Sequence, residues 1–323
     1  MSDIVWTVVG LGQLSLLLEA SSPKPGNVNR IARFSDMDYR NFLTSASLLS
    51  RGLHESATRG VALAKGNLEP SEIGLGELIH ICVKDSLTGL NHRNTILGSI
   101  LLYVPLTVAM TASLTDESKF SIHRIHEYIQ KITEQSTVKD ATNLYKAFQL
   151  TRPGGRMIKE DPAWSNLHRR YDFDNPKAVE HLIEDKVTLS DLFQMSSQVD
   201  EISNEWSNGF QRTLREVLPY LTNVTTKLED LEEGIVRTFV WLLAQRPDGL
   251  IVKKAGRERA DEIQSLAKAT MDKWSVENGS ENLIINFDRI LREEGNLLNP
   301  GTTADIVSLA TFCRLVNITY PEF

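Results

Sequence analysis

The stretch ILGSILLYVPLTVAM, residues 96–110, lies within a longer segment, residues 94–115, that carries no charged side chain. Its length approaches the roughly twenty residues that a membrane-spanning helix needs. The segment is solitary, however, and it contains Gly98, Ser99 and Pro105, which favours a buried helix of a folded core. Because a helix surrounded by other helices is apolar on every side, this stretch predicts an all-α protein with buried central helices.

Helical periodicity recurs along most of the chain. Apolar residues three and four positions apart predict helices over residues 4–20, 38–52, 74–84, 122–136, 140–150, 189–218, 231–245, 258–276 and 303–315. Expected N-caps are Asp36 or Asp38, Ser71, and Thr302 or Thr303. No linker or repeat divides the chain, so we expect a single all-helical domain over residues 1–323, with a loop-rich insertion at about residues 156–187.

The composition is that of an ordinary soluble protein, with 41% hydrophobic and 24% charged residues in a chain of 323. The formal net charge of −7 argues against a general polyanion binder, so we expect no nucleic-acid partner. The cysteines, Cys82 and Cys313, both lie in apolar sequence, which favours a reducing compartment. The chain begins without a basic leader segment, and we expect a cytoplasmic protein that avoids membranes and that could form oligomers.

The segment SSPKPGNVNRIARFSDMD, residues 21–38, directly follows the first predicted helix. Its prolines and its glycine predict a rigid turn, on which Lys24 and Arg30 supply positive charge. Asp36 and Asp38 offer the oxygen ligands that Mg²⁺ takes when it also holds substrate phosphates. In isolation the same residues are more simply interpreted as solvated cations and a helix cap.

Four further clusters combine polar side chains with a loop or a helix start. Helix N-termini, and paired glycines flanked by arginines, are common sites of phosphate binding. Each cluster alone is also explained by a cap, a turn or exposed lysines, and only their joint occurrence indicates a phosphate site. The four are Asn94 with Thr95, Arg152 with Gly154 and Gly155, Lys253 with Lys254, and Thr302 with Asp305.

The order of these blocks resembles the triphosphoribosyl-dephospho-CoA synthase family, from Glu19 to Phe312. The blocks are LLLEASSPKPGNVNR, FSDMDYRNFLTSA, NTILG, DATNLYKAFQLTRPGG, GIVRTFVWLLAQRPDGLIVKKAG and NPGTTADIVSLATF. The resemblance implies an all-helical transferase that joins ATP to 3′-dephospho-CoA through a ribosyl bond and releases adenine, with Mg²⁺ as cofactor.

Such a reaction develops positive charge on the ribose, so the site should place a carboxylate near the sugar, deprotonate the incoming hydroxyl and hold the triphosphate. For these roles we expect Glu19, Asp36 and Asp38 as catalytic residues, and Asp36, Asp38 and Asp305 as metal ligands. The residues expected to bind the substrates are Lys24, Gly26, Asn29, Arg30, Asn94, Thr95, Arg152, Gly154, Gly155, Lys253, Lys254 and Thr302.

The sequence departs from the family pattern in two of these blocks. Members read NTHKG where this chain reads NTILG, so that Ile96 and Leu97 replace a histidine and a lysine, and Asn29 stands where members carry a carboxylate. These changes leave open the acceptor and the reaction. The alternatives are a Mg²⁺-dependent nucleotide- or ribosyl-phosphate-binding protein with a different reaction, and a non-catalytic nucleotide sensor.

Overall fold

A computed structural model describes residues 2–88, 94–151, 169–274 and 281–322, which form helices and connecting loops without a strand in these ranges. The all-α prediction is therefore confirmed. Two helices, α1 (Ser2–Ser21) and α5 (Leu97–Glu117), are long and apolar enough to cross a membrane by length and composition. The apolar window of α5 is 89% buried inside the molecule, so α5 is the central core helix that its all-round apolar surface predicts.

The N-terminal half of the chain surrounds α5. Helices α1, α3, α4 and α6 all pack on it. The crossing with α3 is close, because a Cβ atom on Gly60 would lie 2.3 Å from the carbonyl oxygen of Val108. The helices of this half are α2 (Tyr39–Leu48), α3 (Ser50–Ala64), the 3₁₀ helix η1 (Pro70–Glu72), α4 (Leu75–Ser86), α6 (Ile122–Glu134) and α7 (Val138–Thr151).

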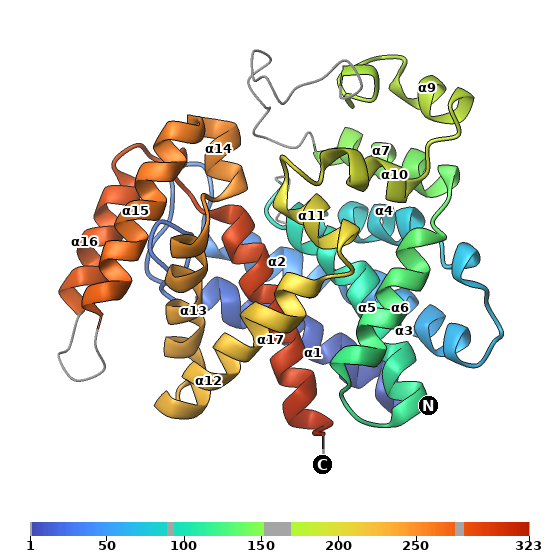
Figure 1. The fold of residues 1–323 in the computed structure, drawn as a ribbon, viewed down its shortest axis with the longest axis horizontal. Coiled ribbons are helices and arrows are strands. Elements are labelled where there is room, and N and C mark those ends of the chain that lie inside the picture. Colours follow the sequence, from blue (N-terminus) through green and yellow to red (C-terminus); the bar gives the residue numbers. More distant parts are fainter. Residues whose placement is uncertain (1, 89–93, 152–168, 275–280, 323) are drawn as a thin grey trace.

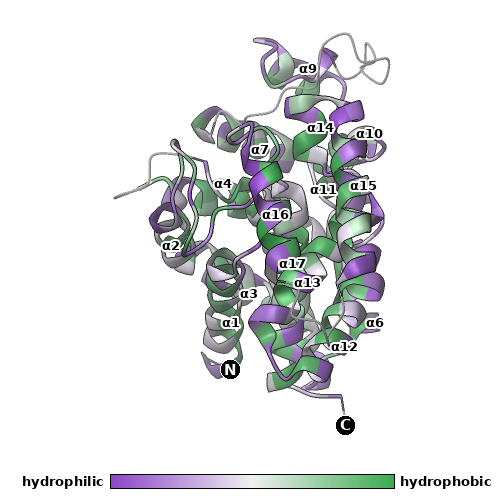
Figure 2. Cartoon of the chain, turned by 90° about the vertical axis from the view of Figure 1, so that its left-hand side faces the viewer, coloured by the Kyte–Doolittle hydropathy of each residue, from purple (hydrophilic) through white to green (hydrophobic). Residues whose placement is uncertain are grey.

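In the C-terminal half, α17 (Gly301–Thr319) runs through the middle of the molecule and packs on α1 and α5 (Figure 1). Hydrophobic residues concentrate on such central helices and hydrophilic ones on the loops and outer faces (Figure 2). The other helices are α9 (Ala178–Glu184), α10 (Leu189–Ser196), α11 (Glu201–Ser207), the π-helix η2 (Thr213–Val217), α12 (Leu218–Leu228), α13 (Leu231–Gln245), α14 (Gly249–Ala255), α15 (Arg257–Lys273) and α16 (Glu281–Arg292).

The single long helix predicted over residues 189–218 is wrong, because this region forms α10, α11 and η2 before α12 begins. Asp200 starts α11 by accepting a hydrogen bond from the backbone N–H of Ser203 at 2.8 Å. Gly209 and Phe210 then both take positive φ angles of 61°, a conformation that a helix does not contain. The apolar period continues through these breaks, which is why periodicity alone misses them.

Other predicted boundaries differ by smaller amounts. The helix expected over residues 38–52 is two helices, of which α3 continues to Ala64. Helices α14 and α16 were not predicted. The described part of the predicted insertion, residues 169–187, contains α9, and the rest of that insertion lies outside the described residues.

The expected N-caps have mixed outcomes. Asp38 caps α2, since its side chain accepts from the backbone N–H of Arg40 at 2.9 Å. Ser71 does not cap α4, which begins after Gly74 in a left-handed conformation. Neither Thr302 nor Thr303 caps α17, whose N-terminus is instead bound by a carboxylate from another helix, described below.

Candidate active site

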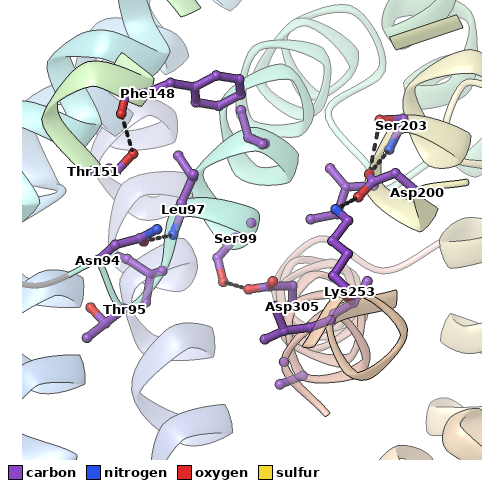
Figure 3. Close-up of a pocket in the computed structure, with 18 of the residues that line it drawn as sticks. Asn94, Thr95, Leu97, Ser99, Phe148, Thr151, Asp200, Ser203, Lys253 and Asp305 are labelled. Carbon is purple, nitrogen blue, oxygen red and sulfur yellow. Dashed lines mark hydrogen bonds and ion pairs between the residues drawn. The ribbon is translucent and has the colours of Figure 1, made fainter. Parts of the chain in front are cut away.

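A cavity of about 970 Å³ opens where the N-terminal ends of α5 and α17 approach α7, α10, α11 and α14. Figure 3 shows Phe148 and Thr151 on one side of it, Asp200 and Lys253 on the other, and the Ser99–Asp305 pair between them. We call one side the polar wall, formed by Glu19, Asp36, Lys253, Lys254, Asn296, Asn299, Thr302 and Asp305, and the other the aromatic wall, formed by Tyr145, Phe148, Tyr171, Phe173, Leu192 and Met195.

Many of the predicted site residues line this cavity, although they are far apart in the sequence. They come from the end of α1, the loop before α2, the start of α5, α14 and the start of α17. The predicted residues on the cavity lining are Glu19, Asp36, Asn94, Thr95, Lys253, Lys254, Thr302 and Asp305. The predicted Arg152, Gly154 and Gly155 lie outside the described residues.

Lys24 does not line the cavity but supports Glu19, which does. The Lys24 side chain is fully buried, and its Nζ lies 2.9 Å from Oε1 of Glu19. It also donates to the backbone carbonyl of Glu19. Burial raises the pKa of Glu19 and lowers that of Lys24, and each opposite charge counteracts the effect on its partner. Oε1 of Glu19 is buried against Lys24 and makes no hydrogen bond of acceptable geometry.

The other predicted loop residues off the cavity lining brace the loop. Gly26 has a φ of 69°, and its N–H donates to Asp288 at 2.8 Å rather than towards the cavity. The Asn29 side chain accepts from two backbone N–H groups of its own turn. Arg30 forms a two-pronged ion pair with Glu232 at the surface, and Asp38 caps α2 and bonds Arg40. These contacts hold the segment that presents Asp36.

Asp305 lies against the first turn of α5. The hydroxyl of Ser99 donates to its Oδ1 at 2.5 Å. A Cβ atom on Gly98 would lie 2.0 Å from Oδ2 of Asp305, so the carboxylate can sit there only because residue 98 is glycine. Burial raises the pKa of Asp305 to about 8, against the effect of the Ser99 hydrogen bond, and the negative charges of Glu19 and Asp248 raise it further.

Asp248 is a residue that our sequence analysis missed. It is buried, and Oδ1 accepts from the N–H groups of Leu250 and Ile251 at the start of α14, at 2.8 and 3.1 Å. Oδ2 accepts from the N–H and the hydroxyl of Thr303 on α17, at 2.7 and 2.8 Å. One carboxylate thus ties together the helices that carry Lys253, Lys254, Thr302 and Asp305. The Asp-Gly pair of the QRPDG turn is a signal for a cap of the following short helix.

A chain of asparagine side chains was also missed. Asn27 donates to Asn299 at 3.0 Å, Asn299 to Asn296 at 3.1 Å, and Asn296 to Oδ2 of Asp36 at 3.3 Å. Nζ of Lys254 donates to the backbone carbonyl of Asn296 at 3.0 Å. This network orients Asp36 and Lys254 on the same side of the cavity. No motif in the sequence links these residues, because the pairs Asn27–Asn299 and Asn296–Asp36 span more than 250 positions.

Lys253 lies on the cavity lining and pairs with Asp200, the N-cap of α11. Burial acts to raise the pKa of Asp200, but the charge of Lys253 and the donors of Ser203 hold it below its ordinary value. Burial lowers the pKa of Lys254, although nearby Asp248 and Asp36 counteract this effect. The cation of Lys253 is therefore already neutralised by a partner, whereas Lys254 is held mainly by carbonyl oxygens.

The charge of the cavity bears on its metal and phosphate ligands. Its described lining includes two lysines, Lys253 and Lys254, and five carboxylates, Glu19, Asp36, Asp172, Asp200 and Asp305. Among the residues that the structure describes, no three histidine, cysteine or carboxylate side chains group closely enough to hold a metal alone. Mg²⁺ commonly uses one or two carboxylates together with substrate phosphates, so Asp36 and Asp305 fit a magnesium that arrives with a polyphosphate.

The helical fold, with a large cavity lined by buried carboxylates, lysines and amides at helix ends, defines an all-α enzyme with a small-molecule site. Residues 6–321 match the CitG family, described as ATP:dephospho-CoA triphosphoribosyl transferase. The chain belongs to this family and is a transferase, which confirms the family resemblance of its sequence blocks.

Individual relatives agree with the family match. A Salmonella typhi protein named "Probable 2-(5''-triphosphoribosyl)-3'-dephosphocoenzyme-A synthase 1" is 22% identical over 311 residues, covering 94% of this chain and 88% of the relative. The Salmonella typhimurium protein of the same name is 23% identical with the same coverage. A crystal structure from Archaeoglobus fulgidus, assigned as a triphosphoribosyl-dephospho-CoA synthase, has a TM-score of 0.59 at 21% identity, over 85% of this chain and 98% of that chain. It shows a shared fold.

Proposed function

We propose that this protein transfers the triphosphoribosyl group of ATP to 3′-dephospho-CoA, with release of adenine. Family membership and the names of the Salmonella relatives support the two substrates. The observation that carries the proposal is the convergence of Glu19, Asp36, Lys254 and Asp305 on one cavity. Carboxylates and cations at the same site suit a substrate that has a ribose to be activated and a polyphosphate to be held.

In the proposed reaction the bond between C1′ of the ATP ribose and N9 of adenine breaks, and a bond forms between C1′ and a hydroxyl oxygen of the acceptor. The electron pair of the broken bond leaves with adenine, which takes up a proton, and the acceptor hydroxyl loses a proton. The triphosphate stays on the transferred ribose. Positive charge develops at C1′ on the way, so a carboxylate near the sugar lowers the barrier.

We assign that carboxylate to Glu19. It is 6% exposed and lines the cavity. The elevated pKa of Glu19, caused by burial, makes it a stronger base than an exposed glutamate, which suits removal of the acceptor proton near neutral pH. Lys24 then holds the Glu19 carboxylate in place rather than contacting the substrate.

We infer that other groups around the cavity bind the polyphosphate. Lys253, Lys254 and the Thr302 hydroxyl supply donors, and Asn94 and Thr95 border the same space at the start of α5. We infer that Mg²⁺ is held by Asp36 and Asp305. The described lining carries five carboxylates and only two lysines, so its cations cannot also neutralise a triphosphate. A bound Mg²⁺ would supply the missing positive charge. Asp38, the third predicted ligand, faces Arg40 and the N-terminus of α2 instead.

The decisive experiment is to incubate the protein with Mg²⁺, ATP and 3′-dephospho-CoA and to follow adenine and the coupled product by liquid chromatography and mass spectrometry. We expect adenine only when both substrates are present. Glu19→Gln should lower the rate at least a hundredfold, whereas Glu55→Gln, on an exposed position of α3, should leave it unchanged. ATP binding without adenine release in the presence of dephospho-CoA would refute the proposal.

One observation favours a second candidate. Ile96 and Leu97 line the cavity with apolar side chains beside the polar groups of Asn94 and Ser99. A pocket that keeps ATP binding but lacks polar groups for chemistry would act as a nucleotide sensor. Mg²⁺-dependent thermal stabilisation by ATP, with no adenine released with any acceptor, would support that function instead.

A cytoplasmic location also remains a proposal. Both cysteines are buried and unpaired, as expected where thiols stay reduced. The cavity lining carries more carboxylates than lysines, which agrees with small-molecule substrates rather than nucleic acid.

A further inference from the structure

The aromatic wall presents aromatic rings on which a flat ligand ring can stack, a feature that the polar wall lacks. Phe148 of α7 meets Phe173 edge-on, with ring centroids 5.8 Å apart and an interplanar angle of 66°. Tyr145 is tilted by 40° against Phe148 at 6.1 Å. None of these rings lies parallel to another, so Phe148 and Phe173 form a corner into which a flat ring can insert, stacking on one and meeting the edge of the other.

The corner joins the main core to a smaller cluster, because Phe148 packs against the main core. Tyr145 belongs to a small separate hydrophobic cluster between α7 and α9, on which Tyr171 and Phe173 pack. The Tyr145 hydroxyl donates to the backbone carbonyl of Tyr171, and the Tyr171 hydroxyl donates to Asp185 at 2.8 Å. The loop that carries Phe173 is thereby tied to both helices, and its aromatic side chain is positioned before a ligand arrives.

The described charges on this side of the cavity disfavour a phosphate. Among the described residues that α7, α10 and the 171–173 loop contribute to the lining, Asp172 is the charged one, whereas both lysines belong to α14. A neutral part of the ligand therefore belongs here. Resting on the proposed function for the identity of the substrates, we propose that the corner of Phe148 and Phe173 is the subsite for the adenine base of a substrate nucleotide.

Asp172 gives this subsite an acceptor for a donor group on the base. Its Oδ1 accepts from the N–H of Asp174 at 3.0 Å, and a carboxylate has further lone pairs for a ligand donor. The exocyclic amino group of adenine is such a donor. Purine riboside lacks this amino group and cannot make the same hydrogen bond.

The test uses adenosine as a probe, without Mg²⁺, and measures its dissociation constant by titration calorimetry. Stacking on an aromatic side chain is worth enough that Phe148→Leu, which keeps an apolar side chain of similar size, should weaken adenosine binding about tenfold. Phe173→Leu, on the loop rather than the helix, is the second variant and should act alike. Trp6→Leu is the matched control, since Trp6 is 58% exposed on α1 and lies off the cavity lining.

Two further probes make the result specific. Inorganic triphosphate with Mg²⁺ should bind Phe148→Leu as it binds the unmodified protein, because the polar wall is unchanged. Asp172→Asn should reduce the preference for adenosine over purine riboside, which lacks the exocyclic amino group, several-fold. Pantetheine, the non-nucleotide arm of dephospho-CoA, is the alternative ligand for this wall. Unchanged adenosine binding in both phenylalanine variants, or weaker binding of pantetheine with unchanged binding of adenosine, would overturn the assignment and place that arm here.

The outcomes also separate this inference from the proposed reaction. Adenosine binding that depends on Phe148, in a protein that never releases adenine from ATP, would leave the subsite standing and remove the reaction. If Phe148→Leu and Phe173→Leu release adenine with unaltered KM values for ATP and dephospho-CoA, the proposed reaction stands and the adenine subsite is refuted.

Discussion

The two walls of the cavity are held by different forces. The polar wall joins segments from both ends of the chain through hydrogen bonds, as in the contacts of Asn27 with Asn299 and of Asn296 with Asp36, and it contains the buried ion pair of Lys24 with Glu19. The aromatic wall is built from neighbouring segments, α7 to α10, that pack a small hydrophobic cluster against the edge of the main core. The polar wall therefore depends on each partner being present, because a buried charge without its partner is costly, whereas the aromatic wall can lose one contact and keep its shape.

The largest expected effect follows from removing the buried cation. Lys24→Met leaves Glu19 buried without its partner, which should lower the free energy of unfolding by about 3–5 kcal/mol. Arg30→Met is the control in the same loop; its ion pair is exposed, at 43% and 41% for the two side chains, so the loss should stay under about 1 kcal/mol. Urea unfolding measures both. Adding Glu19→Gln to Lys24→Met should recover part of the loss, and failure to do so would contradict the pairing.

The next effect concerns Asp248. Asp248→Ala removes acceptors from the N-terminal N–H groups of two helices at once, so we expect a loss of about 2–3 kcal/mol and a higher KM for ATP. Asp230→Ala removes the cap of α13 alone and should cost about 1 kcal/mol without any change in KM. Equal effects of the two variants on stability and KM would mean that Asp248 does not hold α14 against α17.

Gly98→Ala should affect the polar wall without disturbing the aromatic wall. The added Cβ would displace the Asp305 carboxylate, which it approaches to 2.0 Å, at a cost of about 1–2 kcal/mol. We expect at least a tenfold loss of Mg²⁺-dependent triphosphate binding and unchanged adenosine binding. Gly10→Ala, where nothing lies within 4 Å of the new Cβ, should slightly stabilise α1 and leave both ligands unaffected.

The last expected change is the pH dependence caused by Asp305. Its pKa of about 8 exceeds the unfolded value of 3.8. Between pH 4 and pH 8 the folded protein therefore keeps a proton that the unfolded chain has lost, and stability falls as pH rises through that window. Asp305→Asn removes this penalty. Its melting temperature should therefore exceed that of the unmodified protein by an amount that grows from pH 5 to pH 8, corresponding to at most about 4 kcal/mol, because each pKa unit is worth about 1.4 kcal/mol.

The same ionisation should govern magnesium binding at the ligand site that we propose for Asp305. A carboxylate ligand must lose its proton before it binds the ion, so the affinity for Mg²⁺ with triphosphate should rise by up to tenfold per pH unit below pH 8. Titrations at pH 6, 7 and 8 measure this slope. A flat profile in the unmodified protein would show that Asp305 is not a ligand.

Sequence patterns recovered the parts of the fold that depend on local information. The charge-free segment predicted α5, and the periodic segments predicted α1, α13 and α17 close to their observed ends. The pattern failed over residues 189–218, because its apolar period is uninterrupted while the capping by Asp200 and the positive φ of Gly209 break the helix. Helix caps supplied by a distant residue, such as Asp248 for α17, have no local signal at all.

The residues of the candidate site also divide into those that the sequence identified and those that it did not. Glu19, Asp36, Asn94 and Asp305 were identified from their residue types and from the order of the family blocks, and they line one cavity. The asparagine network, Ser99 and the aromatic corner were not, since each acquires its role from a partner more than twenty residues away.

The sequence by itself determined that the chain is all-helical, which segment is buried at its centre, which family it belongs to and which polar residues stand at the helix ends. Those properties follow from side-chain type and spacing, which act over a few residues. Only the tertiary structure decided that Lys24 forms a buried ion pair with Glu19, that Asp38 caps α2 and that Asp248 connects α14 with α17. Burial and hydrogen-bond geometry assign these roles, and both depend on which distant segments come to lie within about 3 Å of each other.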